Sequence, residues 1–457
     1  MVDKTQAQAI DWDSLPPLNV NAAGLDIGAT EIYVCVPTGR DPQSVRRFGT
    51  FTVDLHSLAA WLTTCQIDTV AMEATGVYWI PVYEILEAAG FEVYLVNARH
   101  IKNVAARKSD VSDCQWIQRL HTYGLLRASF RPPEEIAALR ALVRHRETLI
   151  QYRAAHIQHM QKALQLMNVK LTHVISDITG VTGMTIIRAI VAGERNPKVL
   201  AQYRDPACKK SQVEIAKALE GHYKAEHVFV LRQALELYDF YDQQIQACDR
   251  EIERRYQASE PRDPDGQPPT TAPQPTQRKP RKGQAHFDLA SSLYRMVGVD
   301  LTRINGIDAL TAQTLISEIG LDMSKWRTVK HFTSWLGLAP NPKKSGGKVL
   351  TNHAPRAQNR AAQSLRIAAQ TLARSQSALG GFYRRIRAKH GAAQAVVATA
   401  HKLARIVYHM LKYREDYHDL GTDYYEQQYK ERVLRTLTRK AADLGFRLEP
   451  VLTPQVS

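Results

Sequence analysis

Two long runs of apolar residues, spaced alternately three and four apart, constrain this fold more than any other feature of the sequence. The first run follows Pro132-Pro133, and the second ends shortly before a proline-rich segment. Residues spaced in this way line one side of a long helix, and two such helices can pair through those sides. The sequence therefore predicts two long helices that pair as an antiparallel coiled coil, with Arg146 and Arg153 as tolerated exceptions in the seam. The seam positions are 136, 139, 143, 146, 150, 153, 157, 160, 164, 167 and 171, then 231, 234, 238, 241, 245, 248 and 252.

The predicted helix pair divides the chain into segments of different character. Seven of the 21 prolines fall between residues 261 and 280, which is typical of an extended or disordered linker. We expect an N-terminal tail (1–20), an α/β domain (21–131), a coiled-coil arm (132–258) with a helical insert (172–224), a proline-rich linker (259–286), a helical domain (287–420), and a C-terminal helix and tail (421–457).

Strand and helix patterns alternate in the first 130 residues. Runs rich in β-branched and aromatic residues indicate strands, and they lie at 24–36, 47–53, 67–72 and 91–96. Helical patterns lie at 55–65, 77–89 and 112–123. Two or three strands followed by helix, strand, helix, strand and helix predict a mixed sheet flanked by helices, so the fold class is α/β followed by all-α.

Composition limits where the chain works. No apolar run approaches the ~20 residues that span a bilayer, and the first residues lack the apolar core of a signal peptide. The five cysteines are widely spaced without a CxxC pair, which favours core residues in a reducing compartment over disulfides or zinc. We expect a cytoplasmic bacterial protein with no membrane partner, associated with the nucleoid when it acts.

Positive charge is concentrated in one part of the chain. The net charge is +15, and residues 341–414 hold fifteen Lys and Arg but no Asp or Glu. So long a stretch without acids repels itself unless a polyanion is present, so nucleic acid is the predicted partner. An anionic membrane surface is the alternative, although an amphipathic membrane helix needs a cleaner apolar face.

Four carboxylates lie at element boundaries of the α/β domain. Asp26 is placed at the start of the first strand and Glu73 directly after the third, while Asp110 and Asp113 begin the last helix. Ends of adjacent parallel strands lie about 4.8 Å apart, so these acids can converge and bind Mg²⁺ or Mn²⁺ through oxygen ligands. Each acid alone could instead cap a turn or a helix. Their joint pattern indicates a ribonuclease H-like or RuvC-like nuclease core.

A serine within the basic stretch is a second candidate site. Ser345 is followed by Gly346 and Gly347, which allow a close backbone approach to phosphate. Its hydroxyl could attack phosphorus if a base or metal accepts its proton, although a flexible basic turn explains the same residues. The neighbouring residues that could bind phosphate are Lys343, Lys344, Lys348, Arg356, Arg360 and Arg366.

The segment before the serine also has a pattern found in DNA-binding proteins. Residues 301–320 place Asn305-Gly306 in a tight turn before a helix. This pattern is similar to a helix-hairpin-helix, which binds DNA backbone through turn amides. An ordinary helix corner fits the pattern equally well. Trp326 and Trp335 are predicted to be core residues rather than base-stacking residues.

Taken in order, GLDIGATEIYVCVP, VAMEATGVYWIPVYEIL, KSDVSDCQWIQRL, LTRINGIDALTAQTLISEIG and FTSWLGLAPNPKKSGGK closely resemble the DEDD transposases of insertion sequences. That family includes RNA-guided bridge recombinases and Piv-type DNA invertases. The resemblance implies a RuvC-like domain, a coiled-coil arm and a transposase domain. It assigns metal binding to Asp26, Glu73, Asp110 and Asp113, and the nucleophile to Ser345.

The same resemblance implies a covalent phosphoserine link to DNA. It also implies a homodimer or homotetramer in which one protomer's carboxylates serve another's serine, and a bridge RNA that pairs with donor and target DNA. The turn Gly306-Ile307-Asp308 departs from the family's usual GIG. Three alternatives remain open: a RuvC-like metal nuclease, a Piv-like invertase without guide RNA, and a non-enzymatic nucleic-acid-binding protein.

Overall fold

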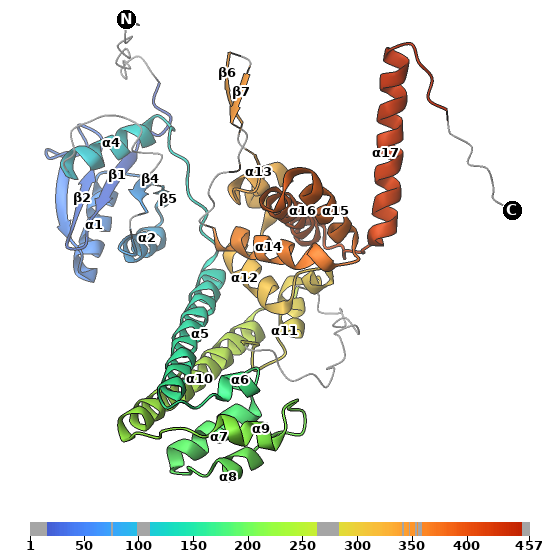
Figure 1. Ribbon diagram of the computed structural model, residues 1–457. Helices are drawn as coiled ribbons and strands as arrows, with labels where there is room; N and C mark the ends of the chain where they lie inside the picture. The colour runs from blue at the N-terminus through green and yellow to red at the C-terminus, as the bar shows by residue number, and fades with distance from the viewer. Residues whose placement is uncertain are drawn as a thin grey trace, which may run out of the picture. The chain divides into compact units, whose positions relative to one another are not determined.

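The structure is a computed structural model, and it divides into two compact units, residues 1–131 and 132–457 (Figure 1). Each unit is described by itself. The residues that the structure describes are 16–74, 76–97, 110–262, 283–340, 342–346, 348–351, 354 and 359–449.

A five-stranded mixed sheet forms the centre of the first unit. Its strands are β1 (Ala22–Ile27), β2 (Glu31–Cys35), β3 (Val45–Gly49), β4 (Thr69–Glu73) and β5 (Glu92–Val96), in the spatial order β3-β2-β1-β4-β5. β1, β4 and β5 are parallel, whereas β2 and β3 run antiparallel to their neighbours. The parallel strands therefore bring their carboxyl ends to one edge of the sheet.

Helices cover both faces of this sheet. The helices are α1 (Thr52–Thr64), α2 (Trp79–Ala88) and α4 (Asp110–Thr122). Leu25 and Met72 belong to the core that buries Leu58 of α1 and Leu86 of α2. On the other face Ala71, Val96, Ile117, Leu120 and Leu126 form a second core, which α4 covers. The predicted α/β class is confirmed, and the arrangement is consistent with a ribonuclease H-like domain.

The strand-like run over residues 24–36 is two strands, so three strands come before the first helix. The chain reverses at Gly28-Ala29-Thr30, and the amide of Gly28 donates to the carbonyl of Glu31 at 2.9 Å. β1 and β2 are therefore an antiparallel hairpin in which Asp26 pairs with Tyr33. Asp26 consequently lies near the carboxyl end of its strand and not at its start.

The next boundary also differs from the prediction. A strand was expected over 47–53, but β3 ends at Gly49 and α1 begins at Thr52. The side chain of Asp54 accepts the amide of Phe51, which closes the first turn of α1. The residues Thr52 and Val53 favour strands by propensity, and this helix start overrides that preference.

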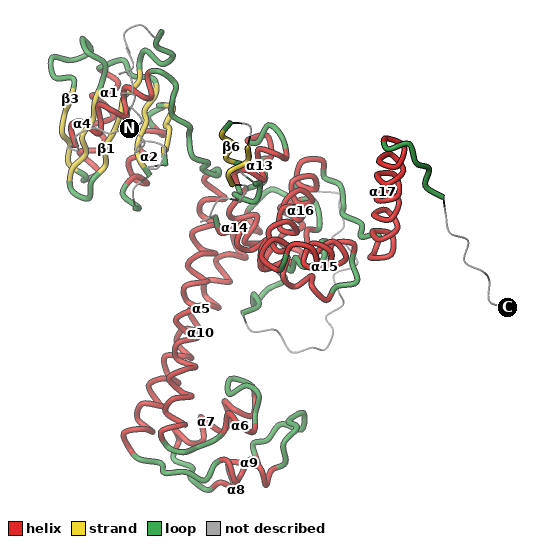
Figure 2. The backbone as a smooth tube through the Cα atoms, turned by 45° about the horizontal axis from the view of Figure 1, so that its top comes forward, coloured by secondary structure: helices red, strands yellow, loops and turns green. Residues whose placement is uncertain are grey.

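Two long helices open the second unit. α5 (Glu134–Leu166) and α10 (Ala225–Ala258) pack side by side over most of their length (Figures 1 and 2). Arg146 pairs with Asp249 and Arg153 with Asp242, so the helices run antiparallel. The predicted apolar positions that are buried between them include Leu139, Val143, Ile245 and Ile252.

The two seam arginines are more than tolerated exceptions. Arg146 is 4% exposed and Asp249 1% exposed, and Nε of the arginine donates to the carboxylate at 2.5 Å. A second guanidinium nitrogen donates to the carbonyls of Gly283 and Gln284, and His286 also contacts Asp249. This buried ion pair therefore fixes the register of the helices and the place where the chain returns after the proline-rich segment.

The helical insert lies between the two long helices in the sequence. It contains α6 (Leu171–Val174), α7 (Val181–Ala192), α8 (Pro197–Gln202) and α9 (Gln212–Ala218). Ile186 and Ile190 of α7, Leu200 of α8 and Ile215 of α9 are buried in one core with the adjoining turns of α5 and α10. The insert is therefore packed onto the end of the helix pair.

The remaining described elements form a helical assembly. They are α11 (Leu289–Val297), η2 (Leu301–Arg303), α12 (Ala309–Ile319), η3 (Met323–Lys325), α13 (Val329–Trp335), β6 (Lys343–Ser345), β7 (Lys348–Thr351), α14 (Arg360–Thr371), η4 (Leu372–Arg374), α15 (Ala378–His390), α16 (Ala392–Tyr413) and α17 (Gly421–Asp443). α16 packs against α13, α14 and α15. Trp326 is buried and its ring lies 4.9 Å from the half-buried Trp335, so both are core residues as predicted.

Candidate active site

The register of β1 and β4 brings two of the predicted carboxylates together. Leu25 pairs with Met72 in the parallel ladder, and Asp26 and Glu73 are the next residues on the two strands. Both side chains are half-buried at the carboxyl edge of the sheet. Neighbouring parallel strands lie about 4.8 Å apart, so these carboxylates occupy adjacent positions.

Strand alternation places both acids on the face that α4 covers. Leu25 and Met72 point into the core beneath α1 and α2, so the next residues point to the opposite face. Ala71, two residues before Glu73, belongs to the core beneath α4. Gly24, two residues before Asp26, lies so close to α4 that a Cβ there would be 2.2 Å from the amide nitrogen of Gln118. The glycine therefore allows α4 to approach the strand that carries Asp26.

Asp113 lies in the first turns of α4, one turn before the buried Ile117. The pKa of the adjacent Cys114 thiol is raised by its hydrogen bond with Cys35, by burial, by its electrostatic interaction with Cys35, and by the negative charge of Asp26. The effect of Asp26 on Cys114 shows that β1 and this part of α4 are electrostatic neighbours. The raised pKa favours the protonated form of this thiol.

Asp110 begins α4, but its side chain lies outside the described part of the structure. Among the described residues, no three His, Cys, Asp or Glu side chains are arranged to hold a metal ion. Asp26, Glu73 and Asp113 supply only carboxylate oxygens, the ligands that Mg²⁺ and Mn²⁺ prefer. Converging carboxylates repel one another, and a divalent cation removes that repulsion. The donor chemistry therefore fits the expected metal, with Asp110 as the fourth candidate ligand.

Ser345 lies in the second unit, at the tip of a two-stranded hairpin. β6 ends at Ser345 and pairs with β7, in which Lys348 is the partner of the serine. The two-residue turn begins with Gly346 at φ 52°, in the left-handed region that glycine adopts most readily. The side chains of Ser345 and Lys348 are exposed. This serine is therefore presented on a tight turn that bulky partners can reach.

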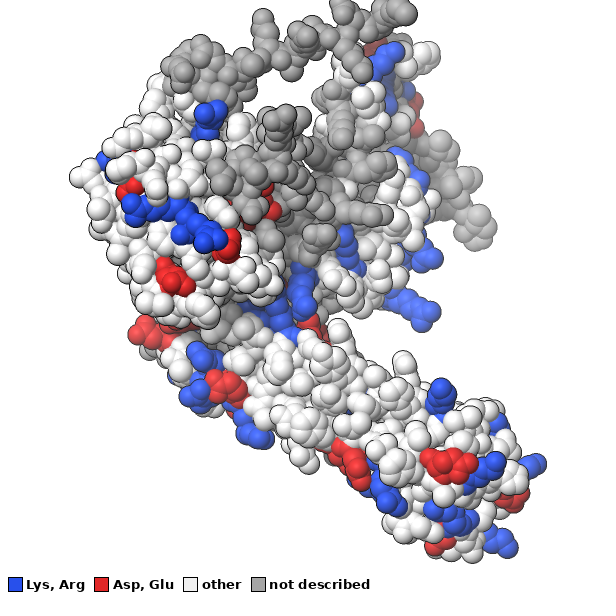
Figure 3. Space-filling model, turned by 90° about the vertical axis from the view of Figure 1, so that its left-hand side faces the viewer, with Lys and Arg blue, Asp and Glu red and all other residues white. Residues whose placement is uncertain are grey.

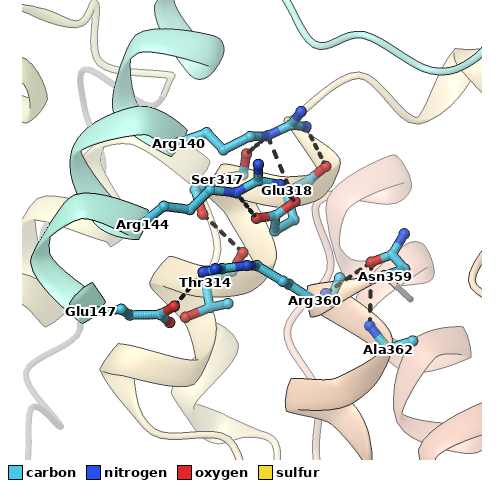
Figure 4. A network of polar contacts seen from close by, with 10 residues as sticks. Arg140, Arg144, Glu147, Thr314, Ser317, Glu318, Asn359, Arg360 and Ala362 are labelled. Atoms are coloured by element: carbon cyan, nitrogen blue, oxygen red, sulfur yellow. Dashed lines mark hydrogen bonds and ion pairs between the residues drawn. The ribbon is translucent and has the colours of Figure 1, made fainter. Parts of the chain in front are cut away.

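The other predicted phosphate contacts have different environments. Arg360 forms an ion pair with Glu147 of α5, and both side chains are about two-fifths exposed, at 42% and 41% (Figure 4). Arg366 is half-buried, and its Nε is buried without a hydrogen-bond partner among the described residues. Gly347 and Arg356 lie outside the described residues, as do the side chains of Lys343 and Lys344.

The turn at Asn305-Gly306 has a packing role in the structure. Gly306 has φ 89°, and a Cβ there would lie 2.9 Å from the carbonyl oxygen of Ala368 in α14. The element before the turn is the 3₁₀ helix η2, and the carboxylate of Asp308 caps α12 by accepting the amide of Thr311. A carboxylate at that helix start competes with a phosphate, so the helix-hairpin-helix interpretation stays a prediction.

One network that the sequence did not predict connects α5 to α12. Glu318 is 7% exposed, and its two carboxylate oxygens accept from Nε and a second nitrogen of Arg144, both at 2.8 Å. Arg140 donates to the carbonyls of Ser317 and Glu318 at 2.9 and 2.7 Å (Figure 4). The sequence signal for this network was Glu318, a charged residue in the otherwise largely apolar helix α12. The contacts fix the long helix against the assembly that carries Ser345.

Comparison with known proteins gives two matches in this chain. Residues 23–169, which include all four candidate carboxylates, match a transposase family of the DEDD type. Residues 300–384, which include Ser345, match the family described as transposase IS116/IS110/IS902. The two matches define the class of protein as a DNA transposase. The chain belongs to the IS110 family of transposases. No curated protein matches the chain.

No helix in the described ranges is long and apolar enough to cross a membrane.

Proposed function

We propose that this transposase cuts and rejoins DNA through a covalent link between Ser345 and a DNA phosphate, with four carboxylates that hold Mg²⁺ or Mn²⁺. The observation that supports this proposal most is the adjacent position of Asp26 and Glu73 on the α4 face. A bound divalent ion would lower the charge on the scissile phosphate and stabilise the attacking and leaving oxygens. Asp113 and Asp110 complete the proposed ligand set.

The chain's own residues have distinct tasks in this proposal. The Oγ atom of Ser345 forms the new P–O bond while the bond between phosphorus and the leaving DNA oxygen breaks. The hydroxyl proton leaves Ser345 for a base, and the leaving DNA oxygen acquires a proton. In the rejoining step a DNA hydroxyl attacks the phosphoserine phosphorus and gives up its proton, the bond between phosphorus and Oγ breaks, and Ser345 takes a proton back. Ser345 belongs to the second unit and the carboxylates to the first. The proposed assembly is a homodimer or homotetramer in which the carboxylates of one protomer serve Ser345 of another.

In this proposal a bridge RNA encoded by the insertion sequence selects the target. The RNA would pair with donor and target DNA, while the protein contacts the DNA backbone. The exposed hairpin and the acid-free stretch after it support nucleic-acid binding without base readout. A structured RNA that copurifies with the chain, encoded beside the reading frame, is the expected finding. Recombination by the RNA-free protein would instead favour a Piv-like invertase.

The catalytic proposal is tested with DNA that carries the junctions flanking the gene. Wild-type protein with Mg²⁺ and its copurified RNA should form a protein–DNA adduct that survives denaturation, and Ser345→Ala should form none. Ser334→Ala, which removes another exposed serine in α13, is the matched control and should behave as wild type. Strand cleavage that persists in Ser345→Ala would establish a RuvC-like metal nuclease instead. Cleavage that is indifferent to Asp26→Asn and to chelation would exclude both enzymatic readings.

A further inference from the structure

A cleft of about 440 Å³ lies between α15, α16 and the first turns of α17. Its walls are mainly apolar and include Leu379, Ile406 and Met410. This volume is within the range of small-molecule sites, about 300–1,000 Å³. α15 packs against both α16 and α17, and Figure 1 shows one end of α17 close to α15. The cleft is in the same unit as Ser345, yet neither the serine nor any proposed carboxylate lines it.

Two tyrosines border the cleft. Tyr425 of α17 packs on Gly381, where a Cβ would lie 3.0 Å from the tyrosine ring, and meets the ring of Phe382 edge-on at 6.2 Å. Tyr417 lies in the segment between α16 and α17. Burial first, and then the charge of Asp419, raise the pKa of Tyr417 to about 12, so its phenol stays neutral. The cleft therefore has aromatic borders on an apolar floor.

Positive charge gathers on the α16 side of this cleft. The ammonium of Lys402 lies 4.0 Å from the ring centre of Phe382 and 5.5 Å from that of Tyr425. Burial and the positive charges of Arg432 and Arg405 lower the pKa of Lys402. Within the described part of the chain, no carboxylate forms an ion pair with Lys402 or Arg405. An anion at this position would relieve the repulsion among these cations.

The acidic residues near the cleft do not neutralise Lys402 and Arg405. Glu415 and Asp416 line the cleft at the end of α16, and Asp416 is engaged by Arg303. Their charges disfavour an anion at their own end of the cleft and so direct it toward Lys402 and Arg405. A ligand that suits the whole cleft therefore has a flat apolar body and one anionic group.

We propose that this cleft binds one unstacked nucleotide of the transposase's DNA, with the base on the apolar and tyrosine surface and its phosphate at Lys402 and Arg405. Base–aromatic stacking combined with a cationic track is how proteins hold unpaired strands without reading sequence. The inference rests on the DNA binding in the proposed function and adds a substrate feature to it. Strand exchange requires unpaired DNA, and a site for a displaced base would hold it open.

The proposal predicts a preference for an unpaired base in equilibrium binding. Two duplexes with equal numbers of phosphates are compared in EDTA, one fully paired and one with a single extrahelical 2-aminopurine. The full-length protein should bind the second about tenfold more tightly, since stacking one base contributes ~1–3 kcal/mol. The fluorescence of 2-aminopurine should fall on binding because the base stacks.

Three variants locate that preference. Ala378→Phe fills the cleft without a change of charge and should abolish the preference while affinity for paired DNA stays unchanged. Tyr417→Ala removes one aromatic border and should reduce the preference even if Ala378→Phe folds poorly. Lys389→Gln is the control, because this exposed lysine at the end of α15 does not line the cleft. It should weaken binding of both duplexes by the same factor.

Equal affinity of wild-type protein for the two duplexes would overturn the inference and leave the proposed function intact. A preference that survives in both Ala378→Phe and Tyr417→Ala would place the base elsewhere and overturn it as well. Failure to bind either duplex would count against the DNA-binding function itself. If a peptide bound in the cleft and the fluorescence of 2-aminopurine did not change when the protein bound the DNA, this surface would be assigned to a protein partner instead.

Discussion

At the scale of single residues, Asp26 illustrates why a carboxylate belongs in a strand that is otherwise apolar. Its neighbours Leu25 and Ile27 are buried on one face of the sheet, and Asp26 turns to the other face beside the first turns of α4. A carboxylate oxygen at this position is a ligand that Mg²⁺ and Mn²⁺ prefer. A half-buried ionisable residue in an otherwise apolar strand is typical of residues retained for chemistry rather than for stability.

Metal binding by Asp26 predicts a change in stability that can be measured without DNA. Mg²⁺ should raise the Tm of the wild-type protein because it binds only the folded state. At one hundred times its Kd, the ion should raise the free energy of unfolding by about 2.7 kcal/mol. Asp26→Asn should lose this shift because the variant lacks one carboxylate ligand. Glu92→Gln, an exposed acid at the opposite edge of the sheet, should keep the shift. Differential scanning calorimetry measures these Tm shifts. Equal Mg²⁺-induced shifts in wild type, Asp26→Asn and Glu92→Gln would rule out a metal site at Asp26.

A second residue-scale prediction concerns His121, which is 1% exposed and whose Nε2 lies 2.8 Å from the hydroxyl of Thr69. Burial lowers the pKa of this imidazole from 6.5 to about 4. Between pH 4 and pH 6.5, the imidazole is therefore protonated in the unfolded chain but neutral in the folded chain. The stabilisation is complete above pH 6.5 and is lost as pH falls toward 4, by about 3 kcal/mol at ~1.4 kcal/mol per pKa unit. Urea titrations at several pH values should show this slope.

The variant His121→Gln tests the origin of that slope. Glutamine can bond to Thr69 but does not titrate, so the stability of the variant should change less between pH 6.5 and 4. His173, a histidine that is not buried, provides the control substitution His173→Gln. If both variants keep the full wild-type slope, carboxylates rather than His121 cause the acid sensitivity.

At the scale of elements, the long helix pair was predictable because its apolar spacing repeats over many turns. Periodicity gives the helices and their facing sides, but it treats Arg146 as an exception. Only the structure shows that Asp249 faces Arg146 and that residues 283–286 complete the network. The hairpin at Gly28 was missed for a related reason. The turn Gly-Ala-Thr lacks the Asn-Gly or Asp-Gly signal, and strand-forming residues continue on both sides.

The network at Arg146 leads to a prediction for the helix pair. Asp249→Ala leaves a buried guanidinium without its partner and should destabilise the protein by ~3–5 kcal/mol. The double variant Arg146→Met/Asp249→Leu removes both charges and should recover much of that loss. As a control, Asp239→Ala breaks the more exposed pair with Arg188, whose side chains are 52% and 32% exposed, and should cost less than ~1 kcal/mol. Chemical denaturation measures all three.

If Asp249→Ala were as stable as wild type, water or another group would satisfy Arg146, and the register would depend on apolar packing alone. If the double variant were as unstable as the single one, the carbonyl contacts at Gly283 and Gln284 would carry most of the stabilisation. Either result would separate the two functions of the network, which are to fix the register of the helices and to hold the chain where it returns after the proline-rich segment.

At the scale of the whole molecule, the candidate site shows how far sequence reasoning extends. Asp26 and Glu73 were predicted to meet because both adjoin strands, and the parallel register brings them together. Spacing along the chain does not show which residues meet in space, so the ion pair of Arg360 with Glu147 of α5 was not predicted. The carboxylates and Ser345 lie in different units.

Charge is also distributed at this scale. On the face that Figure 3 shows, basic and acidic side chains are interspersed along the helix pair and its insert. Many are paired, as in Lys210 with Glu214 and Arg254 with Glu251. Residues 341–414 contain no acid at all. We therefore expect phosphate contacts to concentrate in the acid-free stretch and not on the arm.

This distribution predicts a steep dependence of DNA affinity on salt. Each phosphate contact releases condensed counterions, so six or more contacts should weaken binding by about 10³-fold or more between 50 and 200 mM salt. Arg387→Gln and Lys389→Gln, which alter exposed residues of α15, should each reduce the log–log slope by about one. Arg254→Gln should leave the slope unchanged because Glu251 already holds that guanidinium at 2.7 Å. Fluorescence anisotropy over a salt series measures the slope, and a flat line would remove the acid-free stretch from the DNA interface.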